Sequence, residues 1–379
     1  MNPPRPSGAH QWSVCHGSHR MQVNAPEQEP SEAAEEGTAA HWLAEQVLDH
    51  WSKLAPIAPL KQEYVGSMAE NDVLITDEMW DGVDTYVTDV LKSVRGGATL
   101  PALQIEQRVD LDMIYPGMSG TPDAYIYDAQ ANHLTVWDLK FGHGLVEVIK
   151  NPQLMIYAAG IVSALGLSEV NITLKIVQPR ASHPLGSVRK WQITSKHLNP
   201  LIADLSVAAH LAMGEQPNCV SGTHCRYCSA RHLCRSLSST VYNAIDVITE
   251  SVPMTLDEQG LSTELKLLRR MEQLFKYRLT AIESEIESKL RGGSAIPGFS
   301  AKQKHGRKRW KAGTDLNTVA MVGDLTGVQL RKDMQLLTPS QAKKLGIDEA
   351  VISLYSETPV TGFNVVEDDT LQAQEAFKK

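Results

Sequence analysis

A change in hydrophobic periodicity constrains the fold of this chain more than any other feature. In the first hundred residues, two segments over about 32–52 and 71–95 repeat their apolar side chains at helical spacing. Over 105–114 the apolar residues alternate roughly by two, as in a half-buried strand. Turn residues then separate two further apolar runs, 124–127 and 134–137. The pattern predicts two helices followed by three strands.

The next elements predict that these strands belong to a mixed sheet. We expect a helix over about 152–165 and an apolar strand over 170–177. A strand, a helix and a second strand form a crossover unit, which implies a parallel pair of strands. The predicted fold class is therefore α/β, with a mixed central sheet flanked by helices and a mostly helical C-terminal extension.

The chain is long enough for two domains, since it has 379 residues. We predict a first domain over 1–245, which includes an N-terminal arm and a group of cysteines, and a C-terminal region over 246–379. In the second region, apolar residues over 261–286 recur about every 3.5 residues and predict a long helix, packed on its own domain or paired as a coiled coil. The polar, Pro-rich residues 1–30 are expected to be loosely structured.

The overall composition is ordinary for a soluble protein, with 42% hydrophobic and 21% charged residues. No apolar run reaches the roughly 18 residues of a membrane span, and the N-terminus has no stretch like a signal peptide. We therefore expect a cytoplasmic protein without a membrane partner. The net charge of −8 argues against non-specific coating of nucleic acid, but local basic patches can still bind it.

Carboxylates and a lysine gather where two predicted strands meet. Asp123 precedes one strand, while Asp138 and Lys140 end the next and point to the same face. A hairpin brings all three to one end of the sheet, where carboxylates can bind Mg²⁺ or Mn²⁺ through oxygen. Such an ion polarises a phosphate and activates water, so the set is typical of phosphodiester hydrolysis. Glu36 and Glu106 could add carboxylates, or have only solvated or capping roles.

Two helical motifs flank this group. The segment 37–45 reads Gly-x-x-x-His-x-x-x-Glu and contains His41, which in isolation would be a core or capping histidine. Gln153 and Tyr157 lie four residues apart and share one face of the next predicted helix. Without its neighbours, Tyr157 would be a core aromatic residue.

Together, these motifs resemble the PD-(D/E)XK nuclease superfamily in its RecB/AddB-like branch, with Pro122-Asp123 and Asp138-Leu139-Lys140 as the signature. The resemblance implies a Mg²⁺- or Mn²⁺-dependent DNA nuclease, of the phage exonuclease type. The catalytic residues that it implies are Asp123, Asp138, Lys140, Gln153 and Tyr157. The metal ligands that it implies are His41, Asp123, Asp138 and Leu139.

Four of the five cysteines lie within 16 residues, Cys219 to Cys234, and three of them form a C-x₂-C-x₅-C pattern. Thiolates at this spacing serve either zinc or an iron–sulfur cluster. The resemblance to cluster-containing RecB-like nucleases implies a [4Fe–4S] cluster on Cys15, Cys225, Cys228 and Cys234. A local set in which Cys219 replaces Cys15 would suit Zn²⁺ instead.

The whole-chain pattern also resembles an uncharacterised family of phage and prophage nucleases. The carrying residues include Trp12-x-x-Cys15, 36–41, 120–123, Gln178-Pro-Arg180 and 224–228. This resemblance implies a bacterial host cell, DNA ends or single strands as substrate, and a single-strand annealing protein as a partner. Six basic residues over 302–311, and Arg180, could contact DNA; a solvated loop is an equal interpretation of the basic stretch.

Three functions remain open at this point. The first is a DNA exonuclease, the second a non-catalytic nucleic-acid-binding scaffold, and the third a zinc-ribbon DNA-binding protein. The complete Asp/Asp/Lys set disfavours the scaffold, and the zinc ribbon leaves the segment from Asp123 to Lys140 unexplained. The sequence does not decide cleavage polarity, endonuclease against exonuclease action, DNA against RNA, or the oligomeric state.

Overall fold

The computed structural model describes most of the chain as two compact units, Met1–Arg278 and Leu279–Lys379. The described residues are 1–25, 30–53, 61–95, 103–248, 257–305, 309–311, 314–332, 335–336 and 338–367. The division falls inside helix α9 (Glu258–Arg291), the long helix expected from the sequence. The boundary after residue 245 stays a prediction. Across the described residues, no helix combines the length and apolar character that crossing a membrane requires.

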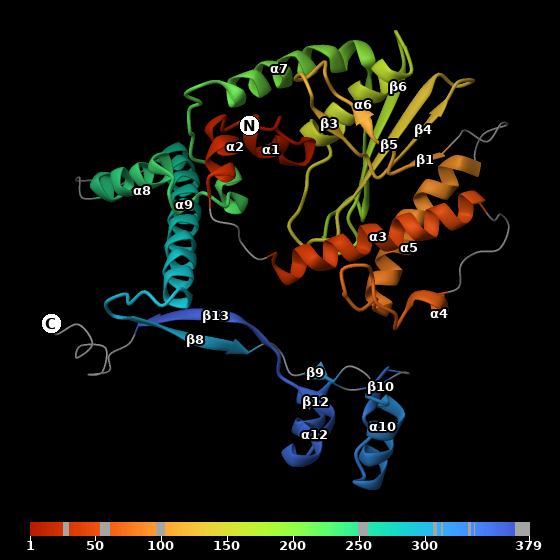
Figure 1. Ribbon diagram of the computed structural model, residues 1–379, viewed down its shortest axis with the longest axis vertical. Helices are drawn as coiled ribbons and strands as arrows, with labels where there is room; N and C mark the ends of the chain where they lie inside the picture. The colour runs from red at the N-terminus through yellow and green to blue at the C-terminus, as the bar shows by residue number, and fades with distance from the viewer. Residues whose placement is uncertain are drawn as a thin grey trace. The chain divides into compact units, whose positions relative to one another are not determined.

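A five-stranded mixed sheet forms the centre of the first unit (Figure 1). In spatial order its strands are β1 (Leu103–Ile105), β4 (Ala124–Asp128), β5 (His133–Leu139), β6 (Asn171–Val177) and β7 (Val188–Thr194). β5 and β6 pair in parallel, and the other neighbouring strands pair antiparallel. The predicted crossover and the mixed-sheet fold class are thus confirmed.

Helices cover both faces of this sheet (Figure 1). On one face lie α3 (Glu32–Lys53) and α5 (Asp77–Arg95), and on the other lie α6 (Pro152–Ala164) and α7 (Ser195–Met213). Strand β5 supplies both cores, because its side chains alternate between the faces. Leu134 and Val136 pack with the α6 and α7 side, while Trp137 and Leu139 pack with α3 and α5. Each such side chain contributes about 1.5–3 kcal/mol by its burial.

The N-terminal arm, residues 1–25, contains three short helices, so the expectation of a loose segment was wrong. They are η1 (Pro6–Gly8), α1 (Ala9–Trp12) and α2 (Gly17–Val23). Trp12 is 2% exposed and its indole N–H donates to the Arg5 carbonyl at 2.9 Å. A buried tryptophan removes much apolar surface from water, which offsets the entropy cost of ordering a Pro-rich segment.

The predicted strand over 105–114 is interrupted. β1 ends at Ile105, and a short β2 (Val109–Asp110) pairs with β3 (Ser119–Gly120) in a separate ladder. Between them Glu106 adopts a positive φ of 45°, which ends the extended conformation. The helix expected from residue 71 begins at Asp77, and β7 and α7 were not predicted from the sequence.

The rest of the first unit consists of short or peripheral elements. They are α4 (Lys61–Tyr64), η2 (Thr223–Tyr227) and α8 (Arg235–Ile248). In the second unit, β8 (Phe299–His305) pairs antiparallel with β13 (Val360–Glu367). A small core of Val319, Leu330, Ala342, Ile347 and Ile352 holds its short helices.

The other elements of the second unit are α10 (Leu316–Leu325), α11 (Pro339–Lys344) and α12 (Glu349–Tyr355), with the two-residue strands β9 (Arg309–Trp310), β10 (Arg331–Lys332), β11 (Gln335–Leu336) and β12 (Ser356–Glu357). Within the expected basic stretch, Arg307 and Lys308 lie outside the described residues. DNA contact by that stretch stays a prediction.

Candidate active site

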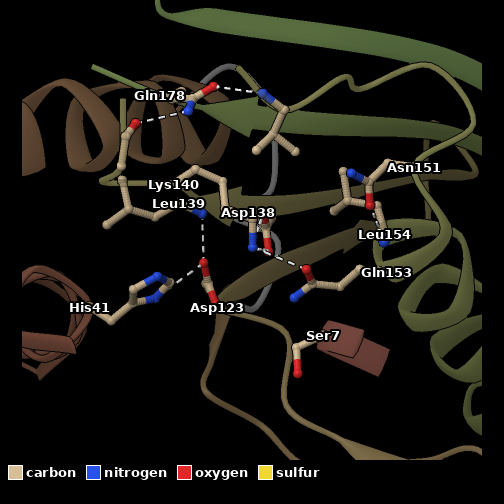
Figure 2. A network of polar contacts seen from close by, with 12 residues as sticks. Ser7, His41, Asp123, Asp138, Leu139, Lys140, Asn151, Gln153, Leu154 and Gln178 are labelled. Carbon is tan, nitrogen blue, oxygen red and sulfur yellow. Dashed lines mark hydrogen bonds and ion pairs between the residues drawn. The ribbon is translucent and has the colours of Figure 1, made fainter. Parts of the chain in front are cut away.

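Asp138 and Lys140 lie at the end of β5, on the same side of the strand, as their spacing predicts. The Lys140 ammonium is 2.9 Å from both carboxylate oxygens of Asp138 and donates a hydrogen bond to Gln153 Oε1 at 3.0 Å (Figure 2). Burial opposes charge on Lys140, but the carboxylates of Asp138 and Asp123 outweigh it and raise its pKa. The lysine is therefore a fixed cation.

Asp123 reaches the same place from the start of β4. In the hairpin, Ala124 pairs with Trp137, so the residue before β4 faces the end of β5. Asp123 Oδ2 accepts the Leu139 backbone N–H at 2.6 Å and lies 3.5 Å from His41 Nδ1 (Figure 2). Burial opposes the charged form, yet His41, Lys140 and the Leu139 N–H lower the pKa of Asp123. The hairpin thus brings Asp123, Asp138 and Lys140 together.

A group of potential metal ligands forms around Asp123. Ligand atoms of His41, Glu106 and Asp123 all lie within 4.8 Å of one another. Glu106 is one of the two carboxylates that the sequence left open, and its backbone N–H donates to the Asp123 carbonyl at 3.2 Å. Burial and the charge of Asp123 raise the pKa of Glu106 to about 7. Two carboxylates held this close favour a cation between them.

The third member of this ligand group is His41, on helix α3. Burial lowers its pKa, but the charge and hydrogen bond of Asp123 and the charge of Asp138 together raise it to about 9. The imidazole is therefore attracted to the carboxylates and is held at the site. A bound cation would replace the proton, since a ligating imidazole is neutral.

Asp138 supplies a buried carboxylate to the site. The residue is 1% exposed, and the Lys140 ammonium forms an ion pair with its Oδ2 at 2.9 Å. Burial raises the pKa of this carboxyl despite the nearby lysine. A buried carboxylate beside Asp123 fits an oxygen-binding cation such as Mg²⁺ or Mn²⁺. Leu139 could add only its main-chain carbonyl, since a leucine side chain has no ligand atom.

Helix α6 carries the Gln153 and Tyr157 pair. The Asn151 side chain caps the helix by accepting the Leu154 N–H at 3.2 Å, which aims the first turn at the site. Gln153 contacts Lys140 directly, and Tyr157 hydrogen-bonds with Gln153. Burial raises the pKa of Tyr157 well above its usual value, so the phenol is neutral.

Gln178 and Arg180, which follow β6, have structural contacts. Gln178 is 1% exposed and donates to the carbonyls of Gly142 and Gly144 at 2.9 and 2.7 Å, so it holds the loop after Lys140. Arg180 forms ion pairs with Glu36 and with Glu78, the latter at 2.9 Å. Because these glutamates offset the charge of Arg180, the predicted DNA contact by this residue is disfavoured. Glu36 is not part of the ligand group of His41, Glu106 and Asp123.

All five cysteines line one small cavity, which joins the N-terminal arm to the 219–234 segment. The Val220 N–H donates to Cys15 Sγ at 3.3 Å, and Cys219 hydrogen-bonds with both Cys15 and Cys234. Burial first, and then the neighbouring thiols, raise the pKa of Cys219 to about 12, while burial raises that of Cys228 to about 11. The choice between Cys15 and Cys219 as fourth ligand therefore remains open.

The fold and this geometry define an α/β protein with a carboxylate–histidine–lysine group at one end of its sheet. The chain belongs to a family described as protein of unknown function (DUF2800), whose model matches residues 5–356. That region includes both the carboxylate group and the cysteines.

One solved structure with some likeness is that of a phage-related exonuclease from Haemophilus somnus 129PT. The sequence identity is 13%, the match covers 56% of this chain and 93% of that chain, and the TM-score is 0.24. We draw no functional inference from this likeness.

Proposed function

We propose that this protein is a divalent-metal-dependent nuclease of the PD-(D/E)XK type that hydrolyses phosphodiester bonds in DNA. The observation that carries the proposal is the convergence of Asp123, Asp138 and Lys140 at one end of β5, beside His41 and Glu106. Carboxylates, an imidazole and a fixed ammonium in one place are the groups that metal-assisted phosphoryl chemistry uses.

The ligands that we assign to Mg²⁺ or Mn²⁺ are His41, Asp123 and Asp138, with the Leu139 carbonyl. Glu106 joins them, because its carboxylate is part of the same close group. Hard oxygen donors dominate this set, which suits either ion. Such an ion, when bound, would polarise the phosphate and lower the pKa of a water molecule.

Lys140 has the geometry to act on the reacting atoms. An ammonium has three donors, and two of them are used by Asp138 and Gln153. The third is free to orient the attacking water or to stabilise charge that develops on the phosphate. Gln153 is itself held by Tyr157, so these two residues position the lysine.

For the cysteine cavity we propose a [4Fe–4S] cluster on Cys15, Cys225, Cys228 and Cys234. The five cysteines line one cavity, and thiolates can hold either zinc or a cluster. The choice of the cluster rests on the resemblance to cluster-containing RecB-like nucleases. The role of the cluster would be to fix the N-terminal arm, while Cys219 stays a free neighbour.

The resemblance to phage and prophage nucleases supports the finer assignments. We propose that the protein is an exonuclease that processes double-stranded ends or single strands during recombination. It would act in the bacterial cytoplasm and cooperate with a single-strand annealing protein. These assignments rest on sequence motifs.

The test compares Lys140, at the end of β5, with Lys175 of β6, which pairs with an aspartate of helix α5. Lys140 pairs with Asp138 at the site. Lys175 lies outside the site, and its Nζ is 2.8 Å from a carboxylate oxygen of Asp89. Wild type, Lys140→Met and Lys175→Met are incubated with labelled linear, nicked and single-stranded DNA and Mg²⁺ or Mn²⁺. We expect cleavage by wild type and Lys175→Met and a loss of at least about 10²-fold in Lys140→Met. Inert wild type on every substrate, or full activity in Lys140→Met, overturns the proposal.

A further inference from the structure

A polar cavity of about 370 Å³ adjoins the candidate active site, and the proposed chemistry does not use it. It is lined by Arg5, Pro6, Ser7, Arg108, Ser119, Gly120, Thr121 and Tyr157. Three parts of the fold meet there: η1 of the N-terminal arm, the segment around the β2–β3 ladder, and helix α6. The N-terminal arm therefore supplies one wall of a cavity beside the site.

The charge of this cavity is positive. Its lining contains two arginines and no acidic residue. Arg108 donates to the Ser119 hydroxyl at 2.9 Å, and within the described residues neither Arg5 nor Arg108 has a carboxylate partner. Arg180, by contrast, is paired with two glutamates. Unpaired guanidinium groups are suited to phosphate, which they bind through two parallel hydrogen bonds.

Hydroxyl groups complete the set of donors. Ser7, Ser119 and Thr121 all line the cavity. Serine and threonine hydroxyls, like arginines, are common donors to nucleic-acid phosphates. The cavity therefore offers two guanidinium groups and three hydroxyls to a phosphate group.

The cavity is connected to the catalytic residues at two points. Thr121 lies two residues before Asp123 in the chain. Tyr157, which also lines the cavity, hydrogen-bonds with Gln153, which in turn accepts a hydrogen bond from Lys140. A strand whose phosphate is bound here would lead directly to the carboxylate group.

The arm is held firmly at this wall. Pro6 is buried, and a Cβ atom on Gly120 would come within 2.9 Å of the Pro6 ring and 2.7 Å of the Tyr157 ring, so only glycine allows this packing. The Arg5 carbonyl is fixed by Trp12, as described above. Arg5 therefore extends from an ordered backbone.

We propose that this cavity binds a phosphate of the substrate strand, next to the one that is cleaved, through Arg5 and Arg108. The inference rests on the proposed nuclease function, and it names the substrate contact that would position the strand. The phosphate comes either from the 5′ end of the strand or from an internal position. Both sources share the same recognition chemistry.

The test measures binding apart from cleavage, in full-length protein that carries Asp138→Ala. Arg5→Gln and Arg108→Gln are added to this background, with Lys190→Gln on the exposed edge strand β7 as the matched control. The probe is labelled linear duplex DNA at several salt concentrations. We expect each arginine variant to bind about tenfold more weakly and to lower the slope of log affinity against log salt by about one. Lys190→Gln should match its parent.

Two forms of the duplex, with and without 5′ phosphates, distinguish the sources. If the cavity binds the 5′ phosphate, the Asp138→Ala parent should bind dephosphorylated DNA weakly. This affinity should equal that of the arginine variants for phosphorylated DNA. An internal site requires that dephosphorylation has no effect while the arginine variants still bind weakly. Unchanged affinity and salt slope in both folded arginine variants overturns the cavity proposal.

Arg5→Lys and Arg108→Lys check the geometry, since lysine keeps the charge but loses the planar fork. We expect them to restore the salt slope and only part of the affinity. The binding assay tests the cavity independently of cleavage. An inert wild type in the cleavage assay would therefore overturn the nuclease function without deciding whether the cavity binds phosphate.

Discussion

The carboxylate group and the cysteine group are both sets of potential metal ligands, yet the fold builds them differently. The carboxylate group lies on neighbouring strands, and the β4–β5 register and the Leu139 N–H fix Asp123. The cysteine group joins residues about two hundred positions apart, Cys15 and the 219–234 segment, and contains no strand. Cys225 packs in a small core with Leu237, Val241 and Leu274.

We therefore expect changes in the carboxylate group to affect catalysis and changes in the cysteine group to affect stability. The central sheet positions the carboxylates, so their removal should leave the fold intact. The cysteines hold the N-terminal arm against the end of the core, where Gly17 packs so tightly that a Cβ would lie 2.4 Å from Cys219 Sγ. Loss of the proposed cofactor should therefore loosen the arm, and with it the Arg5 side of the cavity proposed to bind phosphate.

The largest effect is expected from Asp138→Asn. Catalysis should fall by at least about 10³-fold, because a ligand carboxylate is replaced by a neutral amide. In metal-free buffer the melting temperature should fall only slightly, because the gain from removing a buried carboxylate offsets part of the loss of its ion pair with Lys140. Cleavage rate and melting temperature are measured together. A large fall in melting temperature would show that Asp138 is mainly structural.

The next effect distinguishes the two cysteine sets. Cys225→Ser should lose the bound cofactor whichever set is correct, with destabilisation of several kcal/mol because metal binding is coupled to folding. Cys15→Ser should do the same, whereas Cys219→Ser should keep a brown, iron-containing protein. Metal content and melting temperature of anaerobically purified protein decide this. Retention of metal in Cys15→Ser with loss in Cys219→Ser, and zinc in place of iron, contradicts the iron–sulfur assignment.

The smallest expected effect concerns two glycines of the motifs. Gly120→Ala should destabilise the protein by about 1–3 kcal/mol, because its Cβ would meet the rings of Tyr157 and Pro6. Gly37, in helix α3, has nothing within 4 Å of an added Cβ, so Gly37→Ala should be neutral or stabilise by up to about 1 kcal/mol. Denaturant unfolding measures both. Equal values for the two variants would contradict the close packing of the arm on β3.

The sequence predicted the centre of the site because its geometry is local. A period of two places Asp138 and Lys140 on one face, and a hairpin brings Asp123 to them. The role of Glu106 was left open because it depends on one backbone angle, the positive φ that ends β1. No sequence period encodes such a break.

Long-range packing explains what sequence reasoning missed. Trp12 orders the N-terminal arm by burial against distant elements, and composition alone gives no sign of this. The phosphate cavity unites Arg5 and Arg108, which are about a hundred residues apart. Cys219 stays an alternative ligand, since it lines the same cavity as the other cysteines.

The central claim is that the carboxylate group cleaves DNA by means of a bound divalent cation. The most direct measurement is the rate of strand cleavage by protein treated with EDTA, then dialysed and supplied with Mg²⁺ or Mn²⁺. We expect no cleavage in the treated protein, recovery with either ion, and no recovery when Asp123→Asn replaces wild type. Undiminished cleavage in EDTA, or recovery in Asp123→Asn equal to wild type, would contradict the claim.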